Sequence, residues 1–174
     1  MKKWFLRVSI IVVLFGSIFG FLYTNWEKPE EALSRGLTAL ISLDEAVAKD
    51  YFESRDFQNL WAIVDFRDTR FQELFAQSFD LRIVSMESEG STYRINASIA
   101  NRDVNYAYEA IKEEGDTFAL VVVEKYEELF FELQRAPYIY FNVTIVVERK
   151  GLQYVIVSDS RWLDALLGGW LTQM

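Results

Sequence analysis

The sequence predicts an α+β protein in which helices pack on one face of an antiparallel sheet of about four strands. Two pairs of strand-like runs, over 81–100 and 138–158, each contain a glycine turn and alternate apolar with polar residues. The segments around them carry apolar residues at helical spacing instead. The resulting order is helices, hairpin, broken helix, hairpin, helix, which is typical of the α+β class.

The C-terminal hairpin is the centre of this organisation. Its first run alternates, so one face is apolar and the other carries polar residues and two tyrosines. The apolar face consists of Ile139, Phe141, Val143, Ile145 and Val147. The second run, 152–158, is rich in β-branched and aromatic residues, and Lys150-Gly151 can supply the positive φ of a tight turn.

Residues 1–26 are predicted to be a membrane anchor. A basic Met-Lys-Lys start precedes an apolar run that ends at Tyr23. A helix from Trp4 to Tyr23 rises about 28 Å, which matches a hydrocarbon core of about 30 Å. Aromatic residues belong at both interfaces, where Trp4 lies at one end and Trp26 at the other. Arg7 is near enough to its end of the helix to reach the interface.

The orientation of this segment follows from its charges. The positive-inside rule places the basic N-terminus in the cytoplasm and makes 27–174 a single extracytoplasmic domain of a single-pass plasma-membrane protein. The alternative is a cleaved secretory signal, for which Gly20 preceded by Ile18 is a poor version of the small-residue cleavage site. The uncleaved anchor is therefore favoured.

The next segment is predicted to be helical. Pro29 is tolerated in a first helical turn, and residues 29–41 carry apolar residues at helical spacing. Ser42 and Glu45 match a capping box, which predicts a second helix to about Ser54.

Two further stretches precede the first hairpin. Residues 56–66 are apolar and fit either a buried helical turn or a strand, with the helix favoured. Asp68 or Thr69 can cap the following helix. The apolar stripe of that helix consists of Phe71, Leu74, Phe75 and Phe79.

A broken helix is predicted between the hairpins. Asp103 can cap its first part, and Gly115 interrupts it. Asp116 or Thr117 starts a second part, which runs to Arg135.

A last helix is predicted after the second hairpin. Ser158 or Asp159 can cap it, and Gly168-Gly169 closes it. The terminal Trp170-Leu171 is expected to fold back onto the body.

Composition removes several kinds of chemistry. The chain has no cysteine, so it forms no disulfide and has no thiolate ligand or nucleophile, and it has no histidine, which is the commonest general base and zinc ligand. When Lys2, Lys3 and Arg7 are set aside with the anchor, 15 basic residues remain against 26 acidic ones, a net charge of −11. Such a body is expected to repel nucleic acid and anionic lipid. We predict no metal and no cofactor.

Acidic pairs do not indicate a catalytic site. All four pairs lie in predicted helices, where adjacent residues diverge by about 100° and form solvated faces. The pairs are Glu30-Glu31, Asp44-Glu45, Glu113-Glu114 and Glu127-Glu128. Asp56, Asp65 and Asp68 lack the spacing of a calcium loop. The chain also has no G-x-S-x-G sequence and no glycine-rich phosphate loop.

Tyrosines are the remaining signal for a site. Tyr138 and Tyr140 share the polar face of their strand, and Tyr93 and Tyr108 lie in neighbouring predicted elements. Together they could line a concave cleft or a partner surface. Tyr93 and Tyr108 share faces with apolar neighbours, so core packing is favoured for them. For Tyr138 and Tyr140 both interpretations stay open.

Three short motifs carry a resemblance to a known group. Asn101-Arg102-Asp103 opens a helix after a strand, Glu148-Arg149-Lys150-Gly151 turns a hairpin, and Asp159 to Gly169 closes on Leu-Leu-Gly-Gly. In these motifs the C-terminal half resembles an uncharacterised group of membrane-anchored envelope proteins and lipoproteins of Gram-positive bacteria. Their extracellular domain is of the nuclear-transport-factor-like, or cystatin-like, kind.

The resemblance implies a curved sheet wrapped around helices, which forms a cone that holds a ligand or a partner. It brings no catalytic residues. The lipoprotein members carry a cysteine that this chain lacks, so a membrane helix would be its only anchor.

The favoured function is therefore a non-catalytic binding or scaffolding domain held at the outer face of the plasma membrane. Its expected partners are envelope proteins or a small apolar ligand, and not nucleic acid. The alternative is a small cone-fold enzyme with a buried carboxylate beside a tyrosine donor. Among strand positions, only Asp80 and Glu148 offer such an acid. A deep pocket would favour catalysis, and a filled cone would favour binding.

Overall fold

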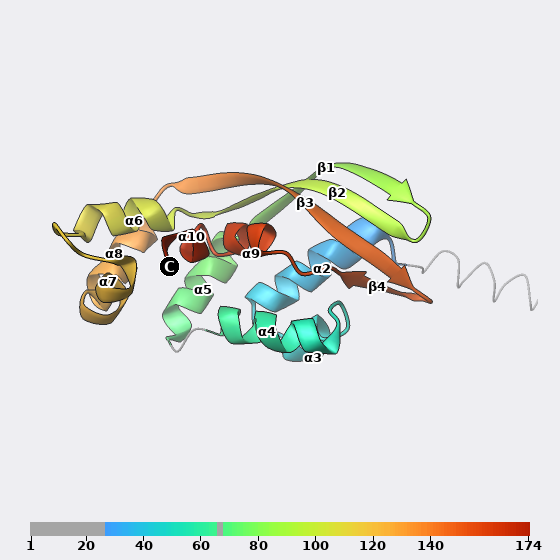
Figure 1. The fold of residues 1–174 in the computed structure, drawn as a ribbon, viewed down its shortest axis with the longest axis horizontal. Helices are drawn as coiled ribbons and strands as arrows, with labels where there is room; N and C mark the ends of the chain where they lie inside the picture. The colour runs from blue at the N-terminus through green and yellow to red at the C-terminus, as the bar shows by residue number, and fades with distance from the viewer. Residues whose placement is uncertain (1–26, 66–67) are drawn as a thin grey trace, which may run out of the picture.

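The computed structural model describes residues 27–65 and 68–174 and has the predicted α+β architecture, with helices packed on a four-stranded antiparallel sheet (Figure 1). The predicted anchor, with Trp4, Arg7, Tyr23 and Trp26, lies outside the described residues. Among the helices that are described, none has the length and apolar character needed to cross a bilayer.

The sheet has the strand order β1-β2-β3-β4, so consecutive strands are neighbours. The strands are β1 (Asp80–Glu89), β2 (Thr92–Arg102), β3 (Tyr138–Lys150) and β4 (Gln153–Ile156). Both predicted hairpins are confirmed, and their turns contain Gly90 (φ +64°) and Gly151 (φ +68°), a conformation that glycine adopts without steric cost. A bulge between Ile83 and Ser85 shifts the β1 register by one residue.

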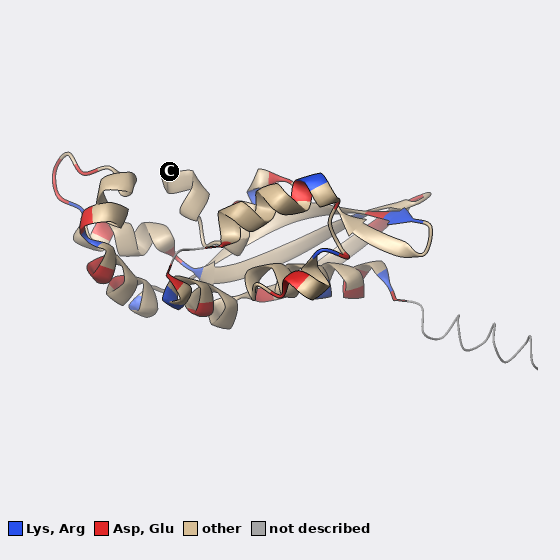
Figure 2. Cartoon of the chain, turned by 90° about the horizontal axis from the view of Figure 1, so that it is seen from below, with Lys and Arg blue, Asp and Glu red and all other residues tan. Residues whose placement is uncertain are grey.

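Helices precede, separate and follow the hairpins in the predicted order. The helices are α2 (Pro29–Ile41), α3 (Glu45–Ala48), α4 (Ser54–Val64), α5 (Thr69–Ser78), α6 (Val104–Ile111), α7 (Phe118–Glu124), α8 (Tyr126–Arg135), α9 (Ser160–Leu166) and α10 (Trp170–Gln173). All of them lie on one side of the sheet or at its end (Figures 1 and 2).

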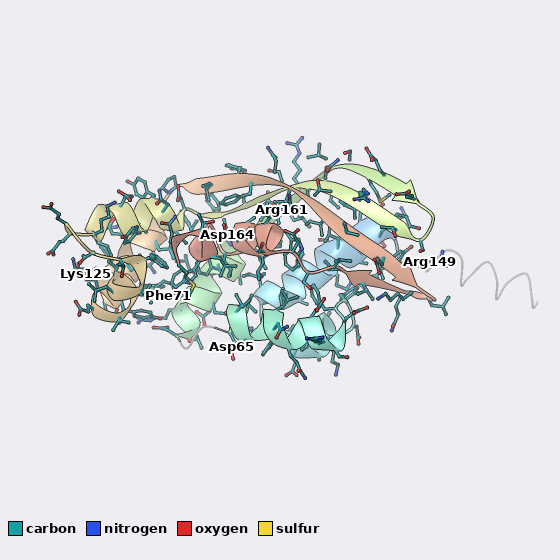
Figure 3. All side chains as sticks on the ribbon, in the orientation of Figure 1. Asp65, Phe71, Lys125, Arg149, Arg161 and Asp164 are labelled. Atoms are coloured by element: carbon teal, nitrogen blue, oxygen red, sulfur yellow. The ribbon has the colours of Figure 1, made fainter. Side chains whose placement is uncertain are left out.

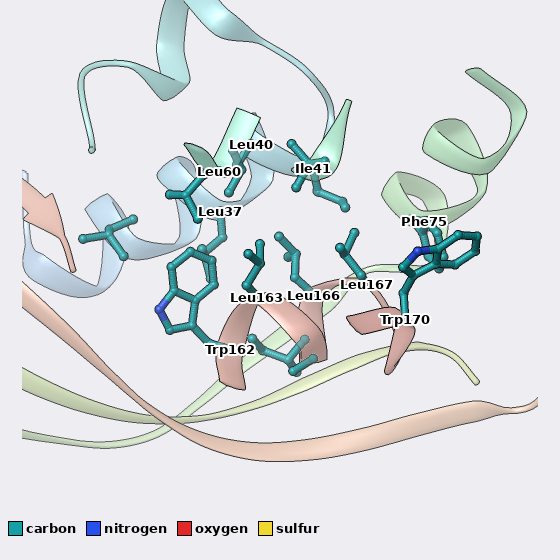
Figure 4. Close-up of a cluster of buried hydrophobic side chains, with 14 of the residues drawn as sticks. Leu37, Leu40, Ile41, Leu60, Phe75, Trp162, Leu163, Leu166, Leu167 and Trp170 are labelled. Carbon is teal, nitrogen blue, oxygen red and sulfur yellow. The ribbon is translucent and has the colours of Figure 1, made fainter. Parts of the chain in front are cut away.

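The core lies between the inner face of the sheet and these helices. Helix α9 packs on β2 and β3, and its side chains fill the space toward α2 and α4 (Figure 4). Trp162 and Leu166 are fully buried there. Trp170 folds back as expected and is 7% exposed, with its ring in edge contact with Phe71, Phe75 and Phe118.

Several predicted helix starts are confirmed by side-chain caps. The carboxylates of Asp68, Asp103 and Asp159 accept backbone N–H groups of the helices that follow them, and Thr117 Oγ1 accepts the N–H of Leu120. Such caps satisfy donors that have no partner inside the helix.

The predicted capping box at Ser42 is wrong. The Ser42 N–H donates to Thr38 O, so Ser42 ends α2, and Leu43 then turns the chain with φ +54°. Asp44 is the cap, because its carboxylate accepts the Val47 N–H at 3.2 Å. The helix ends at Ala48 rather than near Ser54.

The second part of the broken helix is also not continuous. Lys125 adopts φ −119° and ψ 33° and separates α7 from α8. Val121 on α7 and Leu129 on α8 are both fully buried.

Candidate binding surface on the open face of the sheet

The outer face of the sheet is left open by the described helices, which pack on the other face (Figures 1 and 2). Because side chains alternate along a strand, every second residue of β1, β2 and β3 points to this open face. Register places Asp80, Ala100 and Tyr140 in one row across the three strands. The adjacent row consists of Arg82, Ser98 and Asn142.

These two rows form a trough along the central strand. Each row has a small residue on β2, Ala100 or Ser98, flanked by larger side chains on β1 and β3. A hollow of about 510 Å³ results, and Tyr140, Asp80 and Asn142 are among its lining residues. The size difference between central and flanking side chains therefore makes the hollow.

Hydrogen bonds close the trough at one end. In the next row, Thr144 Oγ1 donates to Asn96 Oδ1 at 2.7 Å, and Asn96 Nδ2 donates to Ser85 Oγ at 3.0 Å. This chain of bonds spans β3, β2 and β1. It fixes three polar side chains in place on a surface that solvent reaches.

An arginine and a tyrosine form the other end. Arg102 is opposite Tyr138 in the register, and its guanidinium carbon lies 4.6 Å from the Tyr138 ring centroid, a cation–π contact. The same guanidinium donates to Ala136 O at 2.7 Å and to Ser78 Oγ at 3.3 Å. The contacts position the Tyr138 ring, which is 45% exposed.

The four predicted site tyrosines do not form one surface. Tyr138 and Tyr140 lie on the open face and are 45% and 68% exposed. Tyr93 lies on the inner face with its ring 5.7 Å from that of Tyr154. Tyr108 is on α6, where its ring packs edge-on against Phe118 at 5.5 Å and its hydroxyl donates to Asp116 O. The favoured core assignment of Tyr93 and Tyr108 agrees with these contacts.

The strand carboxylates considered for catalysis also lie on the open face. Asp80 is in register with Ala100, and Glu148 is in register with Thr92, so both point away from the core. The inner side of the sheet is filled by α9 side chains (Figure 4). Within residues 27–65 and 68–174, no group of three or more acidic residues could hold a metal ion.

The predicted solvated helix face is wrong for Glu30, which belongs to the first of the four acidic pairs. Its Oε2 atom is shielded from solvent and has no hydrogen-bond partner among the described residues. Burial makes the largest contribution to the raised pKa of Tyr154, and a hydrogen bond with Tyr93 raises this pKa further. The negative charge of Glu30 adds to the shift. Nothing in the sequence signals this arrangement, because Glu30 resembles an ordinary acid in a first helical turn.

The trough could also not be predicted from the sequence. Tyr138 and Tyr140 could be assigned to one strand face, but the residues opposite them, Arg102 and Ala100, are identified only by register. Comparison of the chain with protein-family models, curated proteins and solved structures finds no match.

Proposed function

We propose that the chain is a non-catalytic, membrane-tethered extracytoplasmic binding or scaffolding domain of the bacterial cell envelope. Its partner surface is the open face of the sheet. The observation that carries the proposal is the trough along β2, with Tyr138 and Tyr140 exposed beside it. Exposed tyrosines combine a large apolar ring with a polar tip, which is typical of binding surfaces.

The chemistry of the trough supports binding rather than bond-making. Its lining includes one acid, Asp80, and one base, Arg82, with amide and hydroxyl groups from Asn142 and Ser98. These groups supply hydrogen-bond donors and acceptors. We expect an extended polar partner that lies along the strands, stacks on Tyr140 and forms hydrogen bonds with the flanking side chains.

The sequence supports the location. The apolar run before residue 27, its basic start and its interfacial aromatic residues favour an anchor with the domain outside. An anchor confines the domain to one surface and so raises its effective concentration for partners there.

In-cell photocrosslinking tests the binding surface. A photoreactive phenylalanine analogue replaces Asn142 in the trough or, as the control, Gln58 on the exposed side of α4. We expect discrete adducts from position 142 that Tyr140→Ala abolishes, and no such adducts from position 58. Equal labelling at both positions would contradict the proposal.

A topology reporter tests the location separately. An alkaline phosphatase fused after Met174 is expected to be active, because that enzyme requires export. Activity of a cytoplasm-specific reporter at the same position would remove the envelope assignment and leave the binding surface standing.

An enzyme that uses a buried carboxylate and a tyrosine on a small hydrophobic ligand is the second candidate function. The observation that favours it is the shielded Glu30 Oε2 near Tyr154. Loss of a measured turnover in Glu30→Gln, with the fold intact, is its expected signature. Unchanged unfolding and unchanged activity in that variant would contradict this second candidate function.

A further inference from the structure

A second surface, remote from the trough, lies on the helices at the end of the sheet. Helices α6, α7 and α8 form this end, opposite the end where the described chain begins (Figure 1). The N–H of Asp103 donates to Pro137 O at 3.0 Å, so the segment leaves the sheet and returns to it at one point. Helices α6, α7 and α8 thus form a helical connection between β2 and β3.

An apolar groove runs between two of these helices. It has a volume of about 280 Å³, and Ile111 of α6 and Phe131 of α8 provide its apolar surface. Phe131 is 47% exposed, and on the neighbouring α7 Val123 is 79% exposed. Large apolar side chains this exposed are typical of an interaction site when they cluster.

The walls of the groove are acidic. Glu127, Glu128 and Glu132 line it, and the segment 104–135 has eight acidic residues against three basic ones. Figure 2 shows several red segments at this end of the chain. Much of the chain's net charge of −8 is therefore concentrated here. A cationic partner would be attracted to it.

Half of the eight acids of the segment form ion pairs with basic side chains, but two acids in the groove do not. Lys125, labelled in Figure 3, pairs with Glu113 at 2.8 Å and with Asp116 at 2.9 Å. These two hydrogen bonds, of which the one to Glu113 contributes more, hold the pKa of Lys125 well above its usual value. Arg70 pairs with Glu127 at 2.8 Å.

Glu128 and Glu132 form no ion pair within the described part of the chain. They are four residues apart on α8, so like charges repel each other along one helix face. A cation bound between them would relieve this repulsion.

The groove itself shows how a cation is received. The Arg135 guanidinium carbon lies 3.6 Å from the centroid of the Phe131 ring. A basic side chain from outside that displaces Arg135 can make the same stacking contact on Phe131 and place its charge beside Glu128 and Glu132. The apolar floor and acidic walls thus complement a side chain with an alkyl stem and a positive end.

We propose that this groove, lined by Ile111, Glu127, Glu128, Phe131 and Glu132, docks a basic amphipathic helix of a partner protein. An amphipathic helix presents apolar residues to the floor at a spacing of three or four, with lysine or arginine beside them for the walls. Acidic lipid and nucleic acid are disfavoured by the same charge. The surface shares no residue with the trough, so the two can act together as a scaffold.

Fluorescence anisotropy with a designed peptide tests this proposal. The probe is a fluorescein-labelled lysine–leucine amphipathic helix of about four turns, titrated with the full chain in neutral detergent. We expect saturable binding. Glu128→Gln with Glu132→Gln should weaken it by about fivefold or more, because two charge pairs are lost, and Phe131→Ala should weaken it by about tenfold.

The control variant removes the same charge elsewhere. Glu87→Gln with Glu89→Gln, on β1, should leave the affinity within about twofold. Circular dichroism checks that each variant keeps its fold. Equal weakening by both double variants would show attraction to net charge alone and overturn the proposal, as would an absence of saturable binding or equal binding of a peptide with glutamate in place of lysine.

Discussion

The two faces of one sheet differ in what covers them. On β2, Ile95 and Ile99 point inward and are fully buried. Ser98, the residue before Ile99, points outward to the trough. The inner face is covered by α9, and the outer face is left open by the described helices (Figures 1 and 4). The same alternation that builds the core therefore also builds a surface that is free to bind, and the two faces should respond differently to substitution.

Trp162→Ala is expected to have the largest effect. Trp162 is fully buried on the inner face, and its indole N–H donates to Val157 O at 3.1 Å. Truncation removes the buried ring, leaves a cavity and frees a carbonyl, which costs about 3–5 kcal/mol of unfolding free energy. Denaturant unfolding followed by circular dichroism measures it. A loss below about 1 kcal/mol would show that the inner face is not the main source of stability.

Asn101→Ala is expected to have the next largest effect. Asn101 is fully buried, and its amide donates to Leu166 O at 2.7 Å and Phe75 O at 3.2 Å. Its loss leaves buried carbonyls without partners, at about 1–3 kcal/mol. Asn142→Ala, which removes the same amide from the exposed face, is the matched control and should cost about 0.5 kcal/mol or less.

Asn101 also shows where sequence reasoning reached its limit. It was recognised as part of a short motif, but its role is to join β2 to α5 and α9 through their backbone carbonyls. These partners lie 26 and 65 residues away in the chain, and no local pattern specifies them. Long-range polar contacts of this kind are invisible to periodicity.

Local chemistry was much more predictable. Alternating residues and glycine turns identified both hairpins, and short polar side chains identified the starts of α5, α6, α7 and α9. The Ser42 capping box failed because Asp44, two residues later, competes for the same role. No glycine or proline marks the break at Lys125, so the local sequence does not signal it.

Only part of the candidate site could be predicted, because the strand face follows from local alternation and the cross-strand partners do not. The strand pattern put Tyr138 and Tyr140 on the polar face. The trough depends on their partners across β2, Arg102 and Ala100, and register is set by the turn and by the whole apolar pattern. A single strand cannot show which residues lie opposite it.

Alkaline titration separates the inner tyrosines from the outer ones. Burial, followed by a hydrogen bond with Tyr93, raises the pKa of Tyr154 above its usual value near 10. The folded state therefore holds the proton more tightly than the unfolded state does, so this contribution to stability is full below about pH 10 and is lost as the pH rises through the folded pKa. Tyr154→Phe should flatten that decline in the unfolding free energy.

Tyr140→Phe is the control for this titration, and it should leave the alkaline decline in place. An equal flattening by both variants would mean that the inner position of Tyr154 does not determine the effect.

Tyr140→Ala is expected to have the smallest effect on stability and a large effect on binding. Tyr140 is 68% exposed, so truncation removes little buried area and costs about 1 kcal/mol or less, chiefly in strand propensity and in its cross-strand contact with Ala100. It also removes the ring that lines the trough. Unfolding and the crosslinking yield from position 142, measured on the same variant, separate the two roles. If stability falls by more than about 2 kcal/mol while adducts persist, the open face is structural and the contrast between the faces fails.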